Sequence, residues 1–472
     1  MLYSKFAPIF LLISLLISCS QIPLVETNQA TEENLYLNEE TETYLDASHI
    51  IQDIKTLSQN SKTYLNKSCS EQPLSNIQKQ LDKKFNNKFF APWQIRNPSS
   101  KRTVNYAFRI YRKNLGYGET QQKRSRKWFN DLVKLANMRA YPNTRRRAIT
   151  IRNTNLRDLP TNKPLFKDFN IAGEGYPFDN LQKSAIWANT PVFVSHISAD
   201  KAWALVDSPR IPGWIPIKDI AFVDKKFIKT WKSGKYVAII NEQTSIIDED
   251  NLFRFKANVG TIFPRIKEEQ NKYQILIAIS DENHQARIRT VYIAKQFAIT
   301  KPLILSQSNI AKVTNQLLNQ PYGWGGMYEN RDCSLTTRDL FTPFGIWLPR
   351  NSKAQAKTAG KYISLKNMSL KQKEQTIVKK GIPYLTLLWK EGHIMLYIGT
   401  FKGKALIFHN FWGIITKDHR GREDRKVIGK SAITTLRPGN ELDNIDDRKG
   451  NFLRNIAGMT ILAASNKLQA CR

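Results

Sequence analysis

Residues 321–360 of the 472-residue chain read PYGWGGMYENRDCSLTTRDLFTPFGIWLPRNSKAQAKTAG. This stretch contains Cys333, directly behind Asp332 and ahead of Ser334. The residues after Cys333 can form a short helix that ends before Pro343, because proline clashes with a helix interior. A cysteine at a helix start lies at the positive end of the backbone dipole, which favours the thiolate that attacks carbonyls. The alternative is a structural thiol, because free cysteines are often buried.

A β-hairpin is predicted downstream of this stretch. Residues 391–399 read EGHIMLYIG and residues 404–409 read KALIFH, with a Lys-Gly pair between them. Two apolar runs on either side of a short glycine-containing turn are typical of a hairpin. In the register that this turn predicts, His393 and His409 fall close together across the two strands.

Cys333, His393 and His409 together favour catalysis over a structural thiol. Nucleophilic catalysis needs a thiol, a histidine that takes its proton, and a second polar group that orients the histidine. The chain has only six histidines, so two of them at facing positions of one hairpin are a specific signal.

The same residues resemble those of a known family. The motifs are Tyr-Gly-Trp-Gly-Gly at 322–326, Asp-Cys-Ser at 332–334, Leu-Pro-Arg-Asn-Ser at 348–352, and Gly-His-Ile with Tyr-Ile-Gly within 392–399, followed by His409. In combination they resemble the NlpC-type bacterial cell-wall cysteine peptidases. The resemblance implies a papain-like fold and hydrolysis of peptidoglycan stem peptides, commonly between D-glutamate and a diamino acid.

The resemblance also assigns roles to single residues. The family's nucleophile matches Cys333, its base matches His393, its third polar residue matches His409, and the aromatic residue of its Gly-rich turn matches Tyr322, which we expect to support the transition state. Leu335 departs from the pattern, since many members have glycine there, and we expect it to alter packing near the cleft.

Composition points to several globular domains with an anionic partner. The chain is 41% hydrophobic and carries a formal net charge of +32, and a chain of this length is too long for a single core. No nucleic-acid-binding motif is visible, so we expect no nucleic-acid partner, and a polyanionic cell envelope explains the charge equally well. We also expect no metal site, no cofactor and a monomeric protein.

The N-terminus predicts the compartment. Residues 1–18 hold one lysine and then an apolar run, which is the length of a signal peptide and too short to span a membrane. The run ends in Leu-Ile-Ser-Cys, which resembles a lipobox and predicts lipidation of Cys19; an ordinary signal peptide is the alternative. Ser20 in place of aspartate resembles the outer-membrane sorting pattern, so we expect anchoring there, facing the periplasm. Residues 19–47 are polar and acidic and predict a flexible tether.

The residue patterns in the rest of the chain predict a multi-domain α+β protein. Residues 48–147 show helical spacing and resemble the family's N-terminal stabilising segment. Residues 148–223 and 224–300 show short strands between turns and predict two small SH3-like β-barrels. Residues 301–472 predict the papain-like α+β peptidase domain.

Two interpretations of the barrels compete. They can bind wall polymers and hold the enzyme on its substrate, or the first barrel can narrow the cleft so that only short muropeptides with a free N-terminal L-alanine fit. On the second interpretation, Asp332 is the counter-charge for the ammonium group, Ser334 adds a hydrogen bond, and Glu174 or Asp179 of the first barrel assists. Helix capping is the other use of Asp332.

The remaining cysteines predict a disulfide. With Cys19 lipidated, Cys69 and Cys471 are left beside the nucleophile, and thiols outside the cytoplasm tend to be oxidised. A Cys69–Cys471 bridge leaves the nucleophile free. The rival to the whole enzymatic interpretation is a non-catalytic envelope lipoprotein that binds peptidoglycan through its SH3-like barrels.

Overall fold

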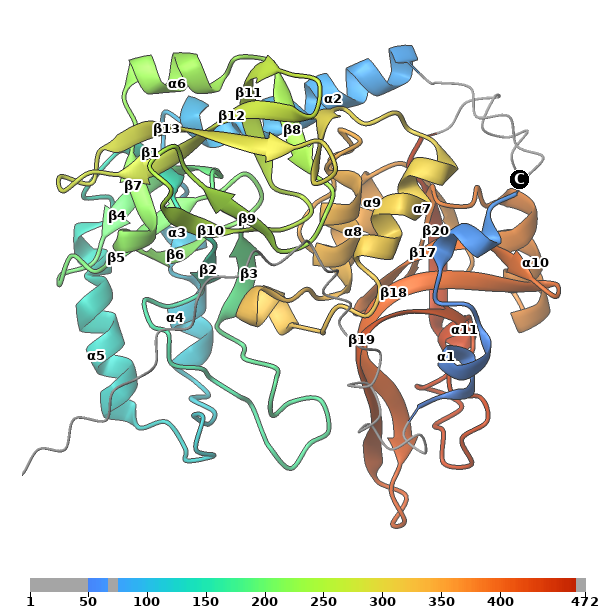
Figure 1. Ribbon diagram of the computed structural model, residues 1–472. Coiled ribbons are helices and arrows are strands. Elements are labelled where there is room, and N and C mark those ends of the chain that lie inside the picture. The colour runs from blue at the N-terminus through green and yellow to red at the C-terminus, as the bar shows by residue number, and fades with distance from the viewer. Residues whose placement is uncertain (1–49, 67–74, 464–472) are drawn as a thin grey trace, which may run out of the picture. The chain divides into compact units, whose positions relative to one another are not determined.

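The computed structural model describes residues 50–66 and 75–463 (Figure 1). The predicted signal peptide and tether lie outside the described residues, as do Cys19, Cys69 and Cys471. Within the described part of the chain, Cys333 is a free and buried cysteine. No helix in this part is both long enough and apolar enough to cross a membrane.

The chain is a mixed helix and sheet protein, which confirms the predicted fold class. A helical N-terminal segment precedes two all-β modules, and a C-terminal domain packs helices on a six-stranded sheet.

Helix α5 (Arg126–Ala136) of the N-terminal segment begins at a polar cap and buries one face. Ser125 accepts a hydrogen bond from the Trp128 backbone N–H at 3.1 Å and so starts the longest fully described amphipathic helix of this part, which buries Phe129 and Leu132. The elements are α1 (Gln52–Thr56), η3 (Ser61–Tyr64), α2 (Ser75–Phe89), η4 (Ala91–Gln94), α3 (Lys101–Val104), α4 (Tyr106–Tyr111), α5 (Arg126–Ala136) and η5 (Met138–Ala140).

An aromatic cluster at the end of α2 ties this segment to both all-β modules. The Trp93 indole N–H donates to the Ala148 carbonyl oxygen at 2.8 Å. The ring of Phe90 lies 5.7 Å from that of Tyr236 in the second module. These contacts bury a continuous apolar cluster shared by three parts of the chain.

The first all-β module is one antiparallel sheet in the order β3-β2-β6-β5-β4-β1-β7. Its first strand begins at Arg146, slightly before the predicted boundary at residue 148. The bounds are β1 (Arg146–Thr150), β2 (Thr154–Arg157), β3 (Gln182–Ile186), β4 (Pro191–Ile197), β5 (Trp203–Asp207), β6 (Pro212–Pro216), η6 (Ile217–Asp219) and β7 (Ile220–Phe222).

The second all-β module opens with a short helix that the sequence pattern did not show. Asp224 caps this helix by accepting from the Phe227 N–H at 2.7 Å. A five-stranded sheet in the order β13-β12-β11-β8-β14 and a β10-β9 pair follow. The bounds are α6 (Lys225–Trp231), β8 (Tyr236–Ile239), β9 (Thr244–Ile247), β10 (Phe253–Ala257), β11 (Ile262–Glu268), β12 (Lys272–Ser280), β13 (Ala286–Ala294) and β14 (Ala298–Lys301).

The C-terminal domain has the sheet order β15-β20-β16-β17-β18-β19. Its buried helix α8 packs against β17 and β18. The bounds are α7 (Gln307–Gln316), η7 (Trp324–Glu329), α8 (Cys333–Phe341), α9 (Ser352–Thr358), β15 (Lys361–Ser364), α10 (Leu370–Lys380), β16 (Thr386–Lys390), β17 (His393–Phe401), β18 (Lys404–Lys417), β19 (Glu423–Thr435), α11 (Phe452–Asn455) and β20 (Ile456–Ile461).

The predicted hairpin is confirmed. Strands β17 and β18 pair antiparallel, with Phe401 opposite Lys404 at the turn. Lys402 and Gly403 have φ angles of 48° and 75°, the left-handed geometry that suits the twist of a two-residue hairpin turn.

The N-terminal segment seals the outer edge of this sheet at the end of β19. Asp53 Oδ2 accepts from both the backbone N–H and the hydroxyl of Thr435, each at 2.8 Å. Gln59 donates to the Ile433 carbonyl oxygen at 3.1 Å and accepts from the Ile433 N–H at 2.9 Å. Two side chains therefore occupy backbone groups that an edge strand leaves open.

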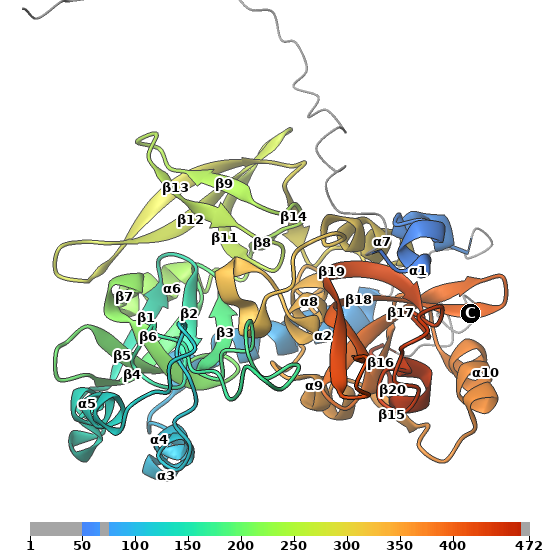
Figure 2. The same ribbon diagram turned by 90° about the horizontal axis from the view of Figure 1, so that it is seen from below.

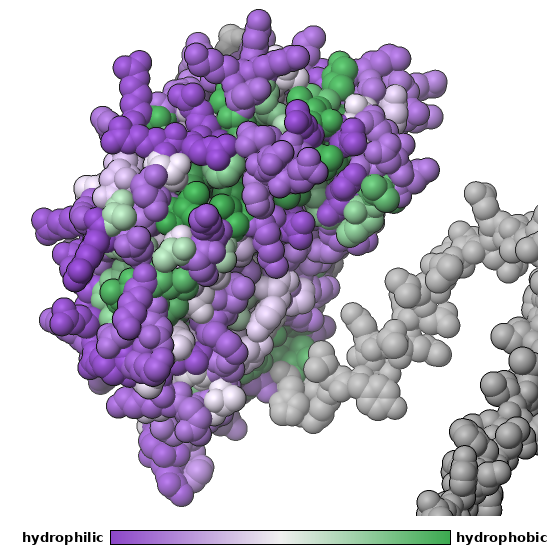
Figure 3. Space-filling view, turned by 90° about the vertical axis from the view of Figure 1, so that its left-hand side faces the viewer, coloured by the Kyte–Doolittle hydropathy of each residue, from purple (hydrophilic) through white to green (hydrophobic). Residues whose placement is uncertain are grey.

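The molecular surface is strongly polar. Figure 3 shows a face covered mostly by hydrophilic side chains, with smaller hydrophobic patches between them. The sequence contains 72 Lys and Arg residues against 40 Asp and Glu residues. This excess favours interaction with anionic polymers and does not by itself identify one.

Candidate active site

Cys333 is the first residue of α8, at the buried end of the helix. Asp332 caps the helix, and its Oδ1 accepts from the Leu335 N–H at 2.8 Å. The backbone N–H of Ile394 faces the Cys333 sulfur. The nucleophile predicted from the sequence therefore lies beside the start of β17, where His393 stands.

The resting sulfur is a thiol, and the predicted thiolate is wrong for the free site. Burial, followed by the negative charge of Asp332, raises the pKa of Cys333 to about 12. The helix dipole contributes about 0.3–1 kcal/mol, which is smaller than the cost of a charged group away from water. The sulfur must therefore lose its proton to a base during the reaction.

His393 and His409 form a hydrogen-bonded pair, and the backbone N–H of Ile394, the residue after His393, faces that sulfur. His393 Nε2 lies 2.9 Å from His409 Nδ1, so the structure brings together the two histidines that the sequence placed on one hairpin. His409 Nε2 lies 3.0 Å from the hydroxyl of Thr434 on β19. The His409 ring stacks on Phe411 at 4.0 Å between ring centroids, which fixes its plane.

The hydrogen-bond chain fits one assignment of the ring protons. The Thr434 hydroxyl donates its proton to the Thr435 carbonyl oxygen at 2.9 Å, so it must accept from His409 Nε2–H. His409 Nδ1 is then the acceptor and receives the Nε2–H of His393. A neutral His393 with its proton on Nε2 keeps a free lone pair on Nδ1, as a base for the thiol requires.

Both imidazoles are neutral near pH 7. Burial lowers the pKa of His393 well below its usual value, and the neighbouring His409 and Lys390 add to the effect. Burial lowers the pKa of His409 to about 3, with a further contribution from Lys390. His393 therefore accepts the Cys333 proton only as the sulfur attacks the substrate and negative charge develops on the carbonyl oxygen.

Tyr322 lies close to the nucleophile, as predicted. Burial raises its pKa well above the usual value, and the negative charge of Asp332 raises it further. The backbone N–H of Tyr322 donates to the Gly429 carbonyl oxygen at 2.7 Å. The phenol keeps its proton and can donate it to an anion that forms near the Cys333 sulfur.

Asp332 and Ser334 are bound to an arginine that the sequence analysis did not assign. Arg350 Nη2 lies 2.7 Å from Asp332 Oδ2, and Arg350 Nη1 donates to Ser334 Oγ at 2.9 Å. The Ser334 hydroxyl donates to Asp332 Oδ1 at 3.0 Å. Within the described residues, Oδ2 has Arg350 as its single hydrogen-bond partner, so one acceptor position remains for a substrate group.

The two candidates from the first all-β module differ in their surroundings. Asp179 has a structural role, which does not support the predicted substrate contact: its Oδ2 pairs with buried Arg157 at 2.6 Å, and its Oδ1 accepts from the Leu165 and Leu181 N–H groups, each at 2.9 Å. Glu174 is half-buried and lies 3.4 Å from Lys167 Nζ, so its role stays a prediction.

Strand β3 of the first all-β module runs along the active-site segments (Figure 2). Gln182 donates to the Gly325 carbonyl oxygen at 3.2 Å. Ser184 Oγ accepts from Arg350 Nε at 2.7 Å. Leu335, the departure from the family pattern, is fully buried in a cluster with Ala185 and Trp187. The side chain that replaces glycine therefore packs the catalytic helix against this strand.

Aromatic side chains continue this contact around the Gly-rich turn. The Trp324 indole N–H donates to the Asp179 carbonyl oxygen at 3.1 Å. Phe178 lies 5.2 Å from Trp324 and 6.0 Å from Trp412, measured between ring centroids. Arg425 on β19 donates to the Ala172 carbonyl oxygen at 3.3 Å. The loop at residues 172–179 of the first module thus contacts both η7 and β19.

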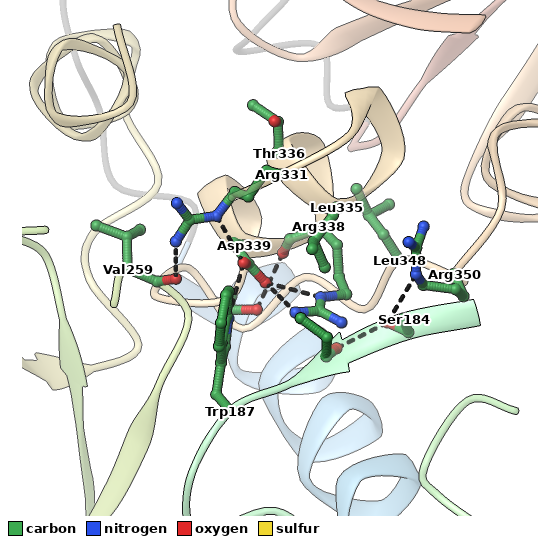
Figure 4. Close-up of polar contacts among 12 residues, drawn as sticks. Ser184, Trp187, Val259, Arg331, Leu335, Thr336, Arg338, Asp339, Leu348 and Arg350 are labelled. Atoms are coloured by element: carbon green, nitrogen blue, oxygen red, sulfur yellow. Dashed lines mark hydrogen bonds and ion pairs between the residues drawn. The ribbon is translucent and has the colours of Figure 1, made fainter. Parts of the chain in front are cut away.

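An ionic network behind α8 joins both all-β modules to the catalytic helix (Figure 4). Asp339 Oδ2 accepts from the Trp187 indole N–H and from Arg331 Nε, each at 2.8 Å. Arg331 Nη2 donates to Glu242 Oε1 at 2.8 Å and to the Val259 carbonyl oxygen at 3.0 Å. Arg331 directly precedes Asp332 and Cys333, so both modules help to fix the start of α8.

Sequence reasoning missed the residues that support the catalytic set. Arg350 lies inside the Leu-Pro-Arg-Asn-Ser motif at 348–352, and a positive charge in a motif that accompanies Asp-Cys-Ser was a usable signal. Thr434 carried none, because its role depends on the pairing of β18 with β19. Lys390, which affects both histidines, was also missed.

Comparisons with known proteins agree with this arrangement. Residues 319–422 match the model of the NlpC/P60 family. Residues 9–141 match the N-terminal NLPC_P60 stabilising domain, residues 164–216 an SH3 domain of the SH3b1 type, and residues 224–270 an SH3 domain of the SH3b2 type. A comparison with curated proteins found no match.

Several solved structures are similar. An NlpC/P60 endopeptidase from Photobacterium damselae subsp. piscicida shares 28% identity, covering 88% of this chain and 98% of that one, with a TM-score of 0.77. An NlpC/P60 family protein from Bacillus cereus ATCC 10987 shares 15% identity over 67% of this chain and 100% of that one, with a TM-score of 0.44. NlpC2 from Trichomonas vaginalis shares 12% identity over 62% of this chain and 96% of that one, with a TM-score of 0.23.

The Photobacterium structure matches in fold over nearly its whole length, and the family models follow one another in the order that the sequence analysis predicted. The chain therefore matches, in order, an N-terminal stabilising domain, two bacterial SH3 domains and an NlpC/P60 domain, and its fold follows that of an NlpC/P60 endopeptidase.

Proposed function

We propose that this protein is a cysteine peptidase that hydrolyses peptidoglycan stem peptides at the bond between γ-D-glutamate and a diamino acid. The observation that supports it most is the hydrogen-bond order of the histidine pair: Thr434 holds His409 so that His393 keeps a free lone pair on Nδ1, and the next residue, Ile394, faces the Cys333 sulfur with its backbone N–H. The family match and the similar endopeptidase support peptidase chemistry, and the particular bond is our proposal.

The reaction is covalent acyl transfer. The Cys333 proton passes to His393 Nδ1 as the sulfur attacks the amide carbonyl carbon. The resulting oxyanion accepts from the Cys333 backbone N–H, for which no acceptor is found within the described residues, and from the Tyr322 hydroxyl. The C–N bond breaks, the amine leaves with the proton from His393, and a thioester remains. Water then attacks the thioester, His393 takes its proton, and the sulfur leaves with a proton restored.

We further propose that the first SH3 domain limits the substrate to short muropeptides with a free N-terminal L-alanine. Phe178, Trp324 and the Ala172–Arg425 contact support this by closing one side of the site. The open acceptor position on Asp332 Oδ2 is available to an ammonium group, and we propose that Glu174 of the first SH3 domain assists it. Because Arg350 already neutralises Asp332, the amine adds a net positive charge, so steric exclusion carries most of this selectivity.

The membrane anchor, the disulfide and the oligomeric state are also proposals. We propose a lipid anchor at Cys19 in the outer membrane, facing the periplasm, a Cys69–Cys471 disulfide and a monomeric state. Mass spectrometry of the mature protein before and after alkylation tests the anchor and the bridge together. An unmodified Cys19, or a third alkylatable thiol in non-reduced protein, contradicts them.

The enzymatic proposal is tested by mass spectrometry of products from defined muropeptides. The tripeptide L-alanyl-γ-D-glutamyl-diaminopimelate is expected to release L-alanyl-D-glutamate, and the same stem carrying its sugar on the alanine is expected to react far more slowly. Cys333→Ala is the matched control and is expected to fold and release nothing. A wild-type protein that cuts neither stem yet binds peptidoglycan would instead be a non-catalytic wall-binding lipoprotein.

A further inference from the structure

Lys390 is a cation beside the catalytic pair without an acidic partner. It ends strand β16 and pairs directly with His393 of β17, and directly opposed residues of an antiparallel pair project from the same face of the sheet. Its Nζ lies 5.0 Å from the centre of the Phe452 ring. The rings of His393 and His409 lie 5.6 Å and 5.7 Å from the same ring. Lysine and both histidines therefore surround one buried phenylalanine.

No carboxylate within the described residues forms an ion pair with Lys390. The titratable groups that act on it are the Cys333 thiol, which is neutral in the resting site, and the cation Arg425. Arg425 is already engaged, since it bonds Glu423 Oε1 at 2.7 Å and the Ala172 carbonyl oxygen. Lys390 is thus the cation at this end of the site that remains available to a ligand.

An unpaired ammonium group in such a place is costly unless a ligand completes it. Burial lowers the pKa of Lys390, which shows that water compensates its charge only in part. An anion that arrives with the substrate would complete this charge, which lies beside the histidine pair.

We propose that Lys390 binds a free carboxylate of the substrate next to the scissile bond. The inference rests on the proposed function, in which two such groups exist: the α-carboxylate of the γ-linked D-glutamate on one side of the bond, and a carboxylate of the diamino acid on the other. Lys390 selects stems in which that carboxylate is free over stems in which it is an amide. Lys390 is a specificity residue, and the proton transfers of the reaction do not involve it.

The test compares three tripeptide substrates in one assay of kcat and KM. The first has both carboxylates free, the second has the D-glutamate α-carboxylate amidated, and the third has the diamino acid carboxylates amidated. Wild-type protein is expected to prefer the free form over one amidated form by about 10- to 100-fold in kcat/KM, the range of one charge-assisted hydrogen bond. The amidated form that reacts slowly identifies which carboxylate Lys390 binds.

Lys390→Met is expected to lose this preference by becoming slower on the free substrate while keeping its rate on the discriminated amide. Lys390→Arg keeps the charge and is expected to keep a preference. Lys402→Met, in the exposed β17–β18 turn, is the matched control for loss of one positive charge and is expected to behave as wild type. If Lys390→Met does not fold, Lys390→Gln takes its place in the same comparison.

Two results overturn the proposal. One is a Lys390→Met or Lys390→Gln protein that keeps the wild-type preference. The other is an equal loss of rate on all three substrates, which would mean that the lysine acts on Cys333 or the histidines instead. A wild-type protein that cuts none of the three stems would refute the proposed function, and that outcome is distinct from a cut without carboxylate preference.

Discussion

Replacing Thr434 by valine tests the proton order of the histidine pair. Valine keeps the shape of threonine and removes the hydroxyl that accepts from His409 Nε2–H at 3.0 Å. His409 is 1% exposed, so its N–H would be left without water or another acceptor in reach. An unsatisfied buried donor costs about 1–3 kcal/mol.

His409 can avoid this cost only by moving its proton to Nδ1. That nitrogen would then donate to His393 Nε2, and the His393 proton would move to Nδ1, where the base has to be. The competent arrangement would lie about 1–3 kcal/mol above the new ground state, which lowers the reactive fraction roughly 5- to 150-fold. We expect kcat to fall by that factor in Thr434→Val with little change in KM.

The assay is steady-state hydrolysis of the tripeptide, with nitrogen NMR of the histidine rings as the direct measure of tautomers. Thr434→Ser keeps a hydroxyl and is the matched control, expected to retain most of the activity and the wild-type tautomers. Equal kcat values for the valine and serine variants would refute the reasoning. So would a valine variant that loses kcat while both rings keep their wild-type tautomers.

Three further predictions concern packing and charge. Gly326→Ala is expected to lower both stability and activity, because a Cβ there would lie 2.7 Å from the Ala185 backbone nitrogen at a φ of +85°; a thermal midpoint equal to wild type would contradict this. Iodoacetamide is expected to label Cys333 at pH 6 more slowly than it labels glutathione, because the Cys333 pKa is raised to about 12; faster labelling would show a preformed thiolate. The free energy of unfolding is expected to fall as the pH drops below about 6.5, because His393 and His409 bind protons in the unfolded chain but not in the folded protein, where their pKa values are lowered. The slope approaches about 1.4 kcal/mol per pH unit for each histidine. Denaturant unfolding at pH 7 and pH 5 measures this slope, and equal free energies at the two pH values would contradict the prediction.

Local signals explain why much of the fold and the catalytic set was predictable. A cap at Asp332, alternating apolar runs and a Lys-Gly turn each act within a few residues, so the helix start and the hairpin follow from the chain itself. His393 and His409 come from one hairpin, and their meeting depends on a single register.

Features that need long-range packing were not predictable in the same way. The thiolate expectation considered only the helix dipole and left out burial, which depends on the whole domain. Thr434 and Arg350 act through partners on other elements. Asp179 is predicted as a substrate contact because it is a carboxylate of the first barrel, while the structure pairs it with the buried Arg157 on β2.

The seal formed by Asp53 and Gln59 makes the C-terminal domain dependent on residues far ahead of it in the chain. A fragment that starts after residue 300 would present the uncovered backbone of Ile433 and Thr435 to solvent, next to the threonine that orients the histidine pair. Exposed strand backbone recruits further strands from neighbouring molecules. Expression of that fragment alone is therefore expected to give self-association, because the side chains of the leading segment no longer cover the edge of β19.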